Sequence, residues 1–197
     1  MLKFASIVLH SFLATALLQL AFVAESRAAE TADVQLEEIK PQPAMSIRFR
    51  AKPKELGPKF GKSMGVLYTY VYSHGGEVIG PPFGRYHDMD DESFDVEAGV
   101  PVAKVIAGND QVKQSELPGG EVATLLYRGP YTELGESHDT LKAWAESNER
   151  EAAGGSWEVY LIGPSQESDP AKYETKLYLP LKKKKGETPP EASPSSN

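Results

Sequence analysis

Residues 127–161 read YRGPYTELGESHDTLKAWAESNEREAAGGSWEVYL, and this stretch decides the fold. It runs from the aromatic end of one strand through a Gly-Pro turn and a Trp-bearing helix to a strand with one carboxylate. Successive side chains of a strand point to opposite faces. In the final WEVYL the three apolar side chains therefore share one face, whereas Glu158 and Tyr160 share the other. We expect the apolar face to pack and the other to offer an acid beside a phenol, as in a small-molecule pocket.

A helix is expected in the middle of this stretch. Leu134, His138 and Leu141 recur at spacings of three and four residues, and with Trp144 they place an apolar stripe along one side. The pair Gly154-Gly155 is expected to end the helix. Trp144 has two interpretations, as part of the packed stripe or as a ring that lines a pocket.

The same organisation occurs twice, at an offset of about 78 residues. Ser46–Arg50 aligns with Thr124–Arg128, and Gly75-Gly76 aligns with Gly154-Gly155. Each copy reads as strand, helix, strand, strand, and ends in a strand that contains a proline. A repeat this long indicates two fused half-domains rather than a solenoid. We therefore predict an α+β domain of two βαββ halves, with a groove where the halves meet.

The N-terminal residues have the pattern of a secretory signal peptide. Lys3 precedes an apolar run from Phe4 to Val23, and small residues flank Arg27, so we expect cleavage after Ala28. The alternative is an uncleaved membrane anchor, because the run approaches the roughly 20 residues that a span needs. In both cases the folded part is expected outside the cytoplasm, either periplasmic or secreted.

The expected domain limits follow from composition. Residues 1–28 are the signal peptide, 29–37 an acidic linker, 38–183 the folded domain and 184–197 a disordered Pro- and Ser-rich tail. The run Lys182–Lys185 is read as a solvated face, with contact to anionic lipid or polymer as the alternative.

Charge and cysteine content exclude several functions. Without residues 1–28 the chain keeps 19 basic and 27 acidic residues, a net charge of −8. Such a surface repels phosphate backbones, so we expect no nucleic-acid binding and a weak preference for cationic ligands. The absence of cysteine excludes thiol nucleophiles, thiolate zinc sites and cysteine-held clusters, and it leaves stability to a packed core.

Motifs in both halves resemble the GyrI-like domain, also called the bacterial transcription-activator effector-binding domain. They are Leu117–Gly120, Tyr127–Tyr131, Trp144 and Trp157–Leu161 in the second half, and Gly80–His87 and Glu97–Val102 in the first, within a match over roughly residues 38–181. The resemblance implies two βαββ units in pseudo-two-fold arrangement around a ligand cleft. It also implies sensing of cationic, often aromatic, drugs, with Glu158 at the base of the pocket. An expected export signal and the lack of a recognisable DNA-binding segment depart from the family's sensors, so transcriptional control and gyrase inhibition are poorly supported.

Seven residues are candidate ligand contacts. Glu158 would supply the charge, although a strand Glu more commonly faces solvent. Aromatic rings would supply stacking area, although each could equally be an ordinary core residue with its polar edge at the surface. No metal site is expected, because the three histidines after residue 28 lack ligand spacing. The ligand-binding candidates are Glu158, Tyr160, Tyr86, Tyr127, Tyr131, Phe83 and Trp144.

The favoured function is capture of a small organic ligand, without a cofactor and without catalysis. One rival is a small hydrolase of electrophilic compounds, with Glu158 as general base and Tyr127 or Tyr160 as acid, though no GxSxG elbow is present. A second is a SOUL-like haem protein with His87 or His138 as axial ligand. A third is a partner-binding module whose groove is filled by its own side chains.

Overall fold

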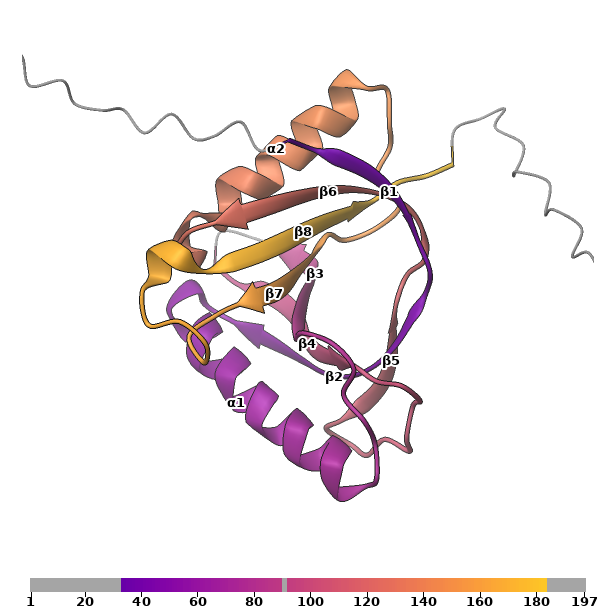
Figure 1. The fold of residues 1–197 in the computed structure, drawn as a ribbon, viewed down its shortest axis with the longest axis vertical. Coiled ribbons are helices and arrows are strands. Elements are labelled where there is room, and N and C mark those ends of the chain that lie inside the picture. The colour runs from indigo at the N-terminus through magenta and orange to yellow at the C-terminus, as the bar shows by residue number, and fades with distance from the viewer. Residues whose placement is uncertain (1–32, 90–91, 184–197) are drawn as a thin grey trace, which may run out of the picture. The chain divides into compact units, whose positions relative to one another are not determined.

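Eight antiparallel strands form one curled sheet in the order β1-β6-β8-β7-β3-β4-β2-β5 (Figure 1). The computed structural model describes residues 33–89 and 92–183. The helices are α1 (Pro53–Ser73) and α2 (Leu134–Ser147), with short 3-10 turns η1 (Tyr131–Glu133) and η2 (Pro170–Lys172). The predicted α+β class is confirmed. The strands are β1 (Gln35–Ile39), β2 (Gln42–Ala51), β3 (Phe83–Met89), β4 (Phe94–Pro101), β5 (Lys113–Leu117), β6 (Gly120–Arg128), β7 (Trp157–Ile162) and β8 (Glu174–Pro180).

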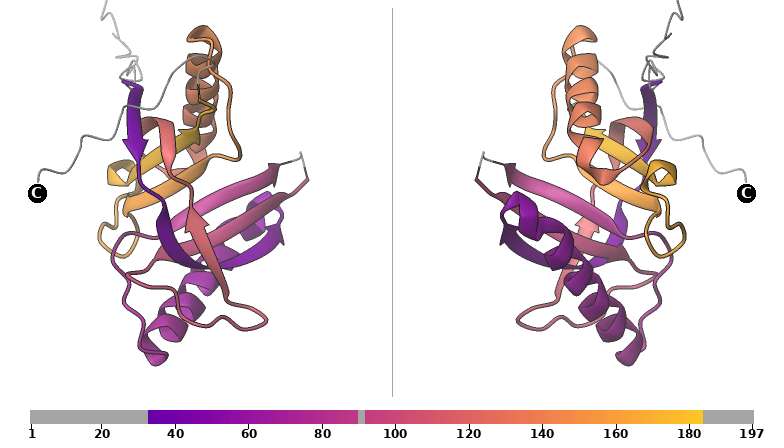
Figure 2. Two further views of the ribbon diagram at one scale, coloured as in Figure 1. Left: turned by 90° about the vertical axis from the view of Figure 1, so that its right-hand side faces the viewer. Right: turned by 90° about the vertical axis from the view of Figure 1, so that its left-hand side faces the viewer.

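Each half contributes the expected strand, helix, strand, strand. The first half is β2-α1-β3-β4 and the second is β6-α2-β7-β8. The halves join through the antiparallel pair β3 and β7, where Gly84 lies opposite Glu158. The side views show the strands of the two halves crossing at a steep angle, with one helix against each half (Figure 2).

The pairing registers repeat with the 78-residue offset. Gln35 of β1 pairs with Thr124 of β6, and Lys113 of β5 pairs with Ser46 of β2. Lys113 comes 78 residues after Gln35, and Ser46 comes 78 residues before Thr124. The strand that precedes each half therefore pairs with the other half. A slip of one residue would turn every side chain of a strand to the opposite face, so the shared register places the side chains of β1 and β5 in the same way relative to their partner strands.

Helix α2 packs through the stripe that the sequence predicts, and α1 packs through an apolar face of its own. Leu67 and Val71 of α1 are buried, as are Leu134 and Leu141 of α2. Helix α1 ends at Ser73, next to the expected glycine pair, and Gly75 adopts a φ of +71° that favours glycine.

Helix α2 ends earlier than the glycine pair at 154–155 predicts. Its last residue is Ser147, and the N–H of Asn148 closes the final turn on the carbonyl oxygens of Trp144 and Ala145. The physical reason is that the buried stripe stops at Ala145, after which exposed polar residues gain nothing from continuing the helix.

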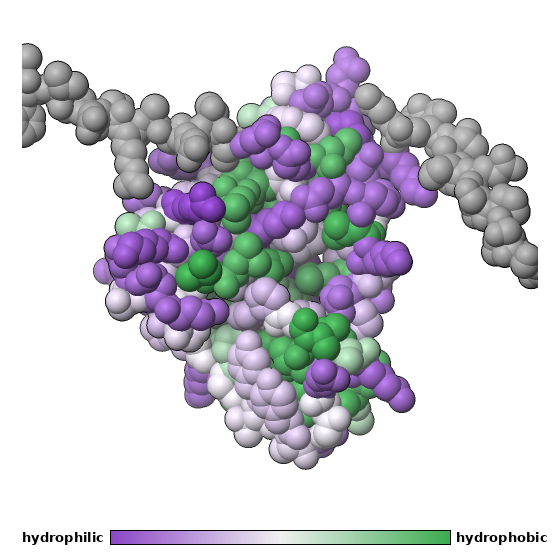
Figure 3. Space-filling view, viewed as in Figure 1, coloured by the Kyte–Doolittle hydropathy of each residue, from purple (hydrophilic) through white to green (hydrophobic). Residues whose placement is uncertain are grey.

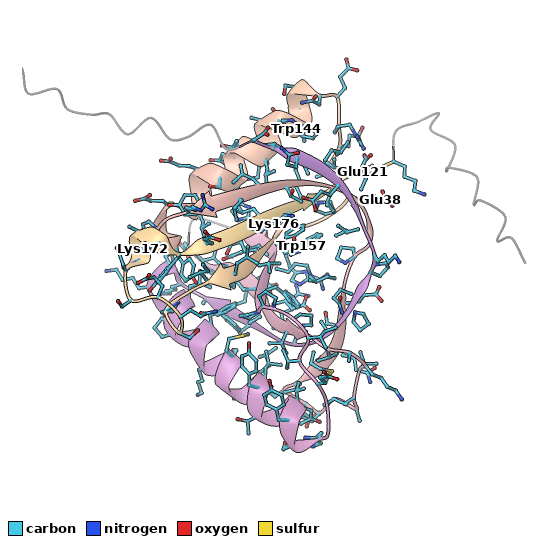
Figure 4. The ribbon with its side chains drawn as sticks, in the orientation of Figure 1. Glu38, Glu121, Trp144, Trp157, Lys172 and Lys176 are labelled. Atoms are coloured by element: carbon cyan, nitrogen blue, oxygen red, sulfur yellow. The ribbon has the colours of Figure 1, made fainter. Side chains whose placement is uncertain are left out.

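Three buried clusters hold the sheet and helices together. One lies between α2 and the second half, one between α1 and the first half, and one on the face of the sheet away from the helices. The third contains Trp157, which stacks on Tyr178 with ring centroids 5.0 Å apart. Figure 4 shows Trp157 on the central strand β7 and Trp144 on α2. Both faces of the sheet are consequently buried at its centre.

Strand β1 begins at Gln35, inside the segment 29–37 expected to be a linker. The strand forms because its backbone pairs with β6, although its side chains are mostly exposed. The expected signal peptide at 1–28 and tail at 184–197 lie outside the described residues. Within the described part of the chain, no helix is both long and apolar enough to cross a membrane.

Candidate functional site

The candidate site is centred on Glu158 of β7, whose side chain lies on the face of the sheet that carries the helices. Its cross-strand neighbours are Gly84 on β3 and Leu177 on β8. Glu158 is only 2% exposed. A carboxylate is rarely buried without polar partners, because loss of hydration disfavours its charged form.

Both carboxylate oxygens of Glu158 have hydrogen-bond partners. The hydroxyls of Tyr160 and Tyr86 donate to Oε2 at 2.6 and 3.2 Å. On the other side, Nε2 of His138 lies 2.7 Å from Oε1, and Oγ of Ser156 lies 3.1 Å from Nδ1 of the same ring. The site is therefore a connected network of one carboxylate, two phenols, an imidazole and a hydroxyl.

Glycine at position 84 makes this arrangement possible. A Cβ there would lie 2.7 Å from the hydroxyl oxygen of Tyr160 and 3.3 Å from Cε2 of Phe60. Any larger residue would therefore push Tyr160 away from Glu158. The close approach of a side chain to the strand backbone is a common reason for glycine inside a strand.

Aromatic rings from both halves cover the carboxylate. The ring of Tyr160 contacts Phe60 of α1 at 5.1 Å and Tyr131 of η1 at 5.3 Å between centroids, both edge to face. Tyr131 also lies 5.0 Å from Tyr173, and Tyr86 lies 5.9 Å from the His138 ring. Offset and edge-to-face pairs of this kind are favourable aromatic packings.

Burial and the carboxylate keep the surrounding phenols protonated. Burial, followed by the charge of Glu158, raises the pKa of Tyr160 well above its ordinary value of 10.0. The same two causes raise the pKa of Tyr86. Burial, with smaller effects of Tyr173 and Glu158, raises the pKa of Tyr131 to about 12. Tyr160 and Tyr86 therefore remain hydrogen-bond donors to Glu158 at neutral pH.

No lysine or arginine pairs with Glu158 in the part of the chain that the structure describes, where its ion-pair partner is His138. The other buried glutamate, Glu97, differs because Arg85 binds it directly. Glu158 is thus a buried acid without a permanent cationic partner.

The protein's own side chains cover Glu158. Two shallow surface hollows, of about 430 and 520 Å³, lie along α1 and are lined by residues other than those around Glu158. Figure 3 shows apolar side chains in separate patches on the visible face, with polar side chains between them. A ligand can reach Glu158 only if Tyr160 and its neighbouring rings move.

Comparison with known proteins identifies the family. Residues 32–182 match the GyrI-like family, described as the GyrI-like small molecule binding domain. The chain belongs to this family. The predicted resemblance is confirmed, and with it the small-molecule-binding class of the GyrI-like domain. No curated protein sequence matches the chain.

Several solved structures share the fold. EcmrR in a DNA complex is 22% identical to this chain with a TM-score of 0.71, and the match covers 78% of this chain and 59% of the EcmrR chain. The C-terminal domain of EcmrR alone has a TM-score of 0.67, over 78% of this chain and 99% of that domain. A hydrolase from Listeria innocua is 14% identical with a TM-score of 0.58, over 77% and 92%. SAV2435 bound to tetraphenylphosphonium is 11% identical with a TM-score of 0.51, over 76% and 94%. The chain thus spans about three-fifths of the EcmrR chain, and at these identities the likeness establishes the fold alone.

Three of the predicted contacts surround Glu158 in this GyrI-like domain, and three do not. Tyr160 and Tyr86 bind the carboxylate, and Tyr131 packs against Tyr160. The other three predicted contacts lie elsewhere. Phe83 is fully buried on the opposite face of the sheet, Tyr127 donates to Glu133 at 2.9 Å, and half-buried Trp144 packs on the core cluster beneath α2.

Several site residues of this GyrI-like domain escaped the sequence reasoning. His138 was assigned to the apolar stripe of α2, although a histidine among leucines could have signalled a polar partner across the cleft. Phe60 lies 98 positions before Glu158 in the sequence, so its part in the site depends on how the two halves meet. Ser156 gave no signal beyond its position two residues before Glu158.

Proposed function

We propose that this GyrI-like domain is an extracytoplasmic protein that captures a cationic aromatic molecule at Glu158. The observation that carries the proposal is a carboxylate that is 2% exposed and has two tyrosines and a histidine, rather than a lysine or arginine, as its described partners. A ligand cation would supply the permanent positive charge that the described residues do not place beside Glu158.

The surrounding rings favour an aromatic cation. The ring of Tyr160, whose hydroxyl binds the carboxylate, contacts the rings of both Tyr131 and Phe60. The face of an aromatic ring attracts a cation, and this attraction adds to the charge pairing with a buried carboxylate. SAV2435, which shares the fold, has been seen with tetraphenylphosphonium, a ligand of this chemistry.

Binding requires the site to open. The hydroxyl of Tyr160 occupies the side of Oε2 that a cation would approach, at 2.6 Å. Rotation of Tyr160 would break that hydrogen bond and its contacts with Phe60 and Tyr131. The ligand's aromatic groups would then replace the lost ring contacts, so the open state is populated mainly when ligand is present.

The binding proposal is tested by calorimetric titration of the full chain with tetraphenylphosphonium. We expect saturable binding to the wild type and at least a tenfold loss of affinity in Glu158→Gln, which keeps the shape but removes the charge. Glu38→Gln, on the exposed edge strand β1, removes the same charge elsewhere and should bind like the wild type. Equal affinity of the wild type and Glu158→Gln, or equal losses in both variants, would contradict the proposal.

The extracytoplasmic location rests on the signal-peptide pattern of residues 1–28. Fractionation of cells that produce the full chain with a C-terminal epitope tests it. We expect a shortened product in the fraction outside the cytoplasm, whereas a full-length product in the cytoplasm would contradict the assignment.

Hydrolysis is the second candidate, because a hydrolase shares the fold and Glu158 lies beside protonated phenols. Glu158 would activate water as the general base, and Tyr160 would donate a proton to the leaving atom. Tyr127, the other candidate acid from the sequence, does not suit this role because its hydroxyl donates to Glu133. Turnover of an electrophilic substrate that is lost in Glu158→Gln, while binding persists, would favour catalysis over capture.

A further inference from the structure

Thr175 of β8 carries a fully buried hydroxyl for which residues 33–89 and 92–183 provide no hydrogen-bond partner. Its side chain is 0% exposed, and among the described residues no hydrogen-bonding atom pairs with its Oγ1. Buried hydroxyls nearly always have a partner, because an unpaired one loses its hydration without compensation. An unpaired hydroxyl at a candidate binding site therefore needs an explanation.

The pairing register places Thr175 on the same face as Glu158. Thr175 lies directly opposite Tyr160 of β7 on one side and Tyr127 of β6 on the other. Tyr160 and Glu158 are two residues apart on β7, so their side chains share a face, and Thr175 shares it with them. Glu158 pairs with Leu177, which makes Thr175 its diagonal neighbour at roughly 7–8 Å between backbones.

The charged neighbour of Thr175 in sequence belongs to the other face. Lys176 binds Glu37 through two contacts of 2.7 and 3.0 Å and lies over the Tyr178 ring. Thr175 is therefore separated from that ion pair by the sheet. On its own face it lies beside the ring of Tyr160, which contacts Phe60 and Tyr131.

The movement that would expose the carboxyl group of Glu158 to a ligand would also expose the hydroxyl of Thr175. Tyr160 is both the phenol bound to Glu158 and the direct cross-strand neighbour of Thr175. Its rotation would expose the carboxyl group of Glu158 and the hydroxyl of Thr175 together, on the same face of the sheet. A ligand that enters there meets the carboxyl group and, on the neighbouring strand, a hydroxyl that can donate or accept a hydrogen bond.

We propose that Thr175 is a specificity-determining residue that hydrogen-bonds a polar atom of the ligand. The inference rests on the proposed capture of a cation by Glu158. It narrows the ligand class to aromatic cations that also carry a hydroxyl, ether or carbonyl group. Such a ligand would pair with a hydroxyl that has no partner among the described residues.

Matched probes separate this hydrogen bond from cation capture. The probes are tetraphenylphosphonium and its three singly hydroxylated isomers, titrated calorimetrically into the full chain. We expect at least one isomer to bind the wild type roughly three- to tenfold more tightly than the parent cation, the gain of one net hydrogen bond. In Thr175→Val, which keeps the shape, the advantage should vanish while the affinity for the parent cation stays the same.

Thr124→Val is the matched control. Thr124 is also a buried strand threonine, but its hydroxyl donates to Glu37 at 2.7 Å on the other face of the sheet. This variant should lose thermal stability and keep the hydroxyl advantage, whereas Thr175→Val should melt no lower than the wild type.

The outcomes distinguish the two proposals. If neither the parent cation nor any isomer binds, the capture proposal fails. If the parent cation binds but no isomer gains, or if the gain survives in Thr175→Val, the role of Thr175 is overturned while capture stands. A clear loss of thermal stability in Thr175→Val would also overturn it, because the hydroxyl would then have a partner within the protein.

Discussion

Nε2 of His138 lies 2.7 Å from Oε1 of Glu158, and both side chains are at least nine-tenths buried. His138 comes from α2 and Glu158 from the central strand β7, so this contact ties the helix of the second half to the middle of the sheet. It also places a histidine where a ligand cation would have to be accommodated. The contact between His138 and Glu158 should therefore affect both the stability of the fold and the proposed binding of a cation.

A double-mutant cycle of Glu158→Gln and His138→Gln measures that link. Because the contact is buried and involves a carboxylate, we expect a coupling free energy of about 1.5–3 kcal/mol in urea unfolding. The exposed pair Asp139 and Lys142, 3.4 Å apart on the same helix, is the matched control and should couple by less than about 0.5 kcal/mol. Similar coupling in both cycles would show that burial does not strengthen the first contact.

Gly84→Ala should disturb the site and the fold together. The added Cβ would lie 2.7 Å from the Tyr160 hydroxyl, so we expect a loss of about 1–3 kcal/mol in unfolding free energy and a change in cation affinity. Gly61→Ala in the exposed face of α1 is the control, since a Cβ there meets nothing within 4 Å. It should gain up to about 1 kcal/mol from helix propensity. If Gly84→Ala changed neither the unfolding free energy nor the cation affinity, the space between Gly84 and Tyr160 would be larger than the structure shows.

Acid should weaken the fold through Glu97, on the face of the sheet away from the helices. Burial alone would raise its pKa, but hydrogen bonds from Ser115, Arg85 and His87 lower it from 4.5 to about 2. Since the folded pKa lies below the unfolded one, the stabilisation is complete above about pH 4.5 and is lost as the pH falls towards 2.

The loss is on the order of 2–3 kcal/mol and is measured by urea unfolding at several pH values. In Glu97→Gln the slope of stability against pH should flatten between pH 4.5 and 2. An unchanged slope in that variant would assign the acid sensitivity to other carboxylates.

Much of the architecture could be predicted because residue patterns in the sequence indicate where the helices and strands lie and which side of each is buried. The apolar stripe of α2 and the strand alternation around Glu158 are local patterns, and the order of elements expected from the 78-residue repeat also occurs in the structure. The end of α2 was misplaced because a glycine pair is a permissive signal, whereas the loss of buried residues after Ala145 ended the helix first.

The site could be predicted only in part, because its members meet across the two halves. Strand alternation was sufficient to put Glu158 and Tyr160 together. Phe83 shows the limit of this reasoning: it was a candidate ligand contact, but the register opposite Val159 turns it to the Trp157 side of the sheet. The contributions of Phe60 and His138 depend on how each helix packs on the sheet, which local pattern does not specify.

The most direct measurement of the central claim compares tetraphenylphosphonium with tetraphenylborate, ions of nearly equal size and opposite charge. Calorimetric titration of the wild type should show binding of the cation and none of the anion, and Glu158→Gln should weaken the cation at least tenfold. Glu38→Gln corrects for the net negative charge of the chain. If both ions bind the wild type equally, or if the cation binds Glu158→Gln as tightly as the wild type, Glu158 is not the group that selects the ligand.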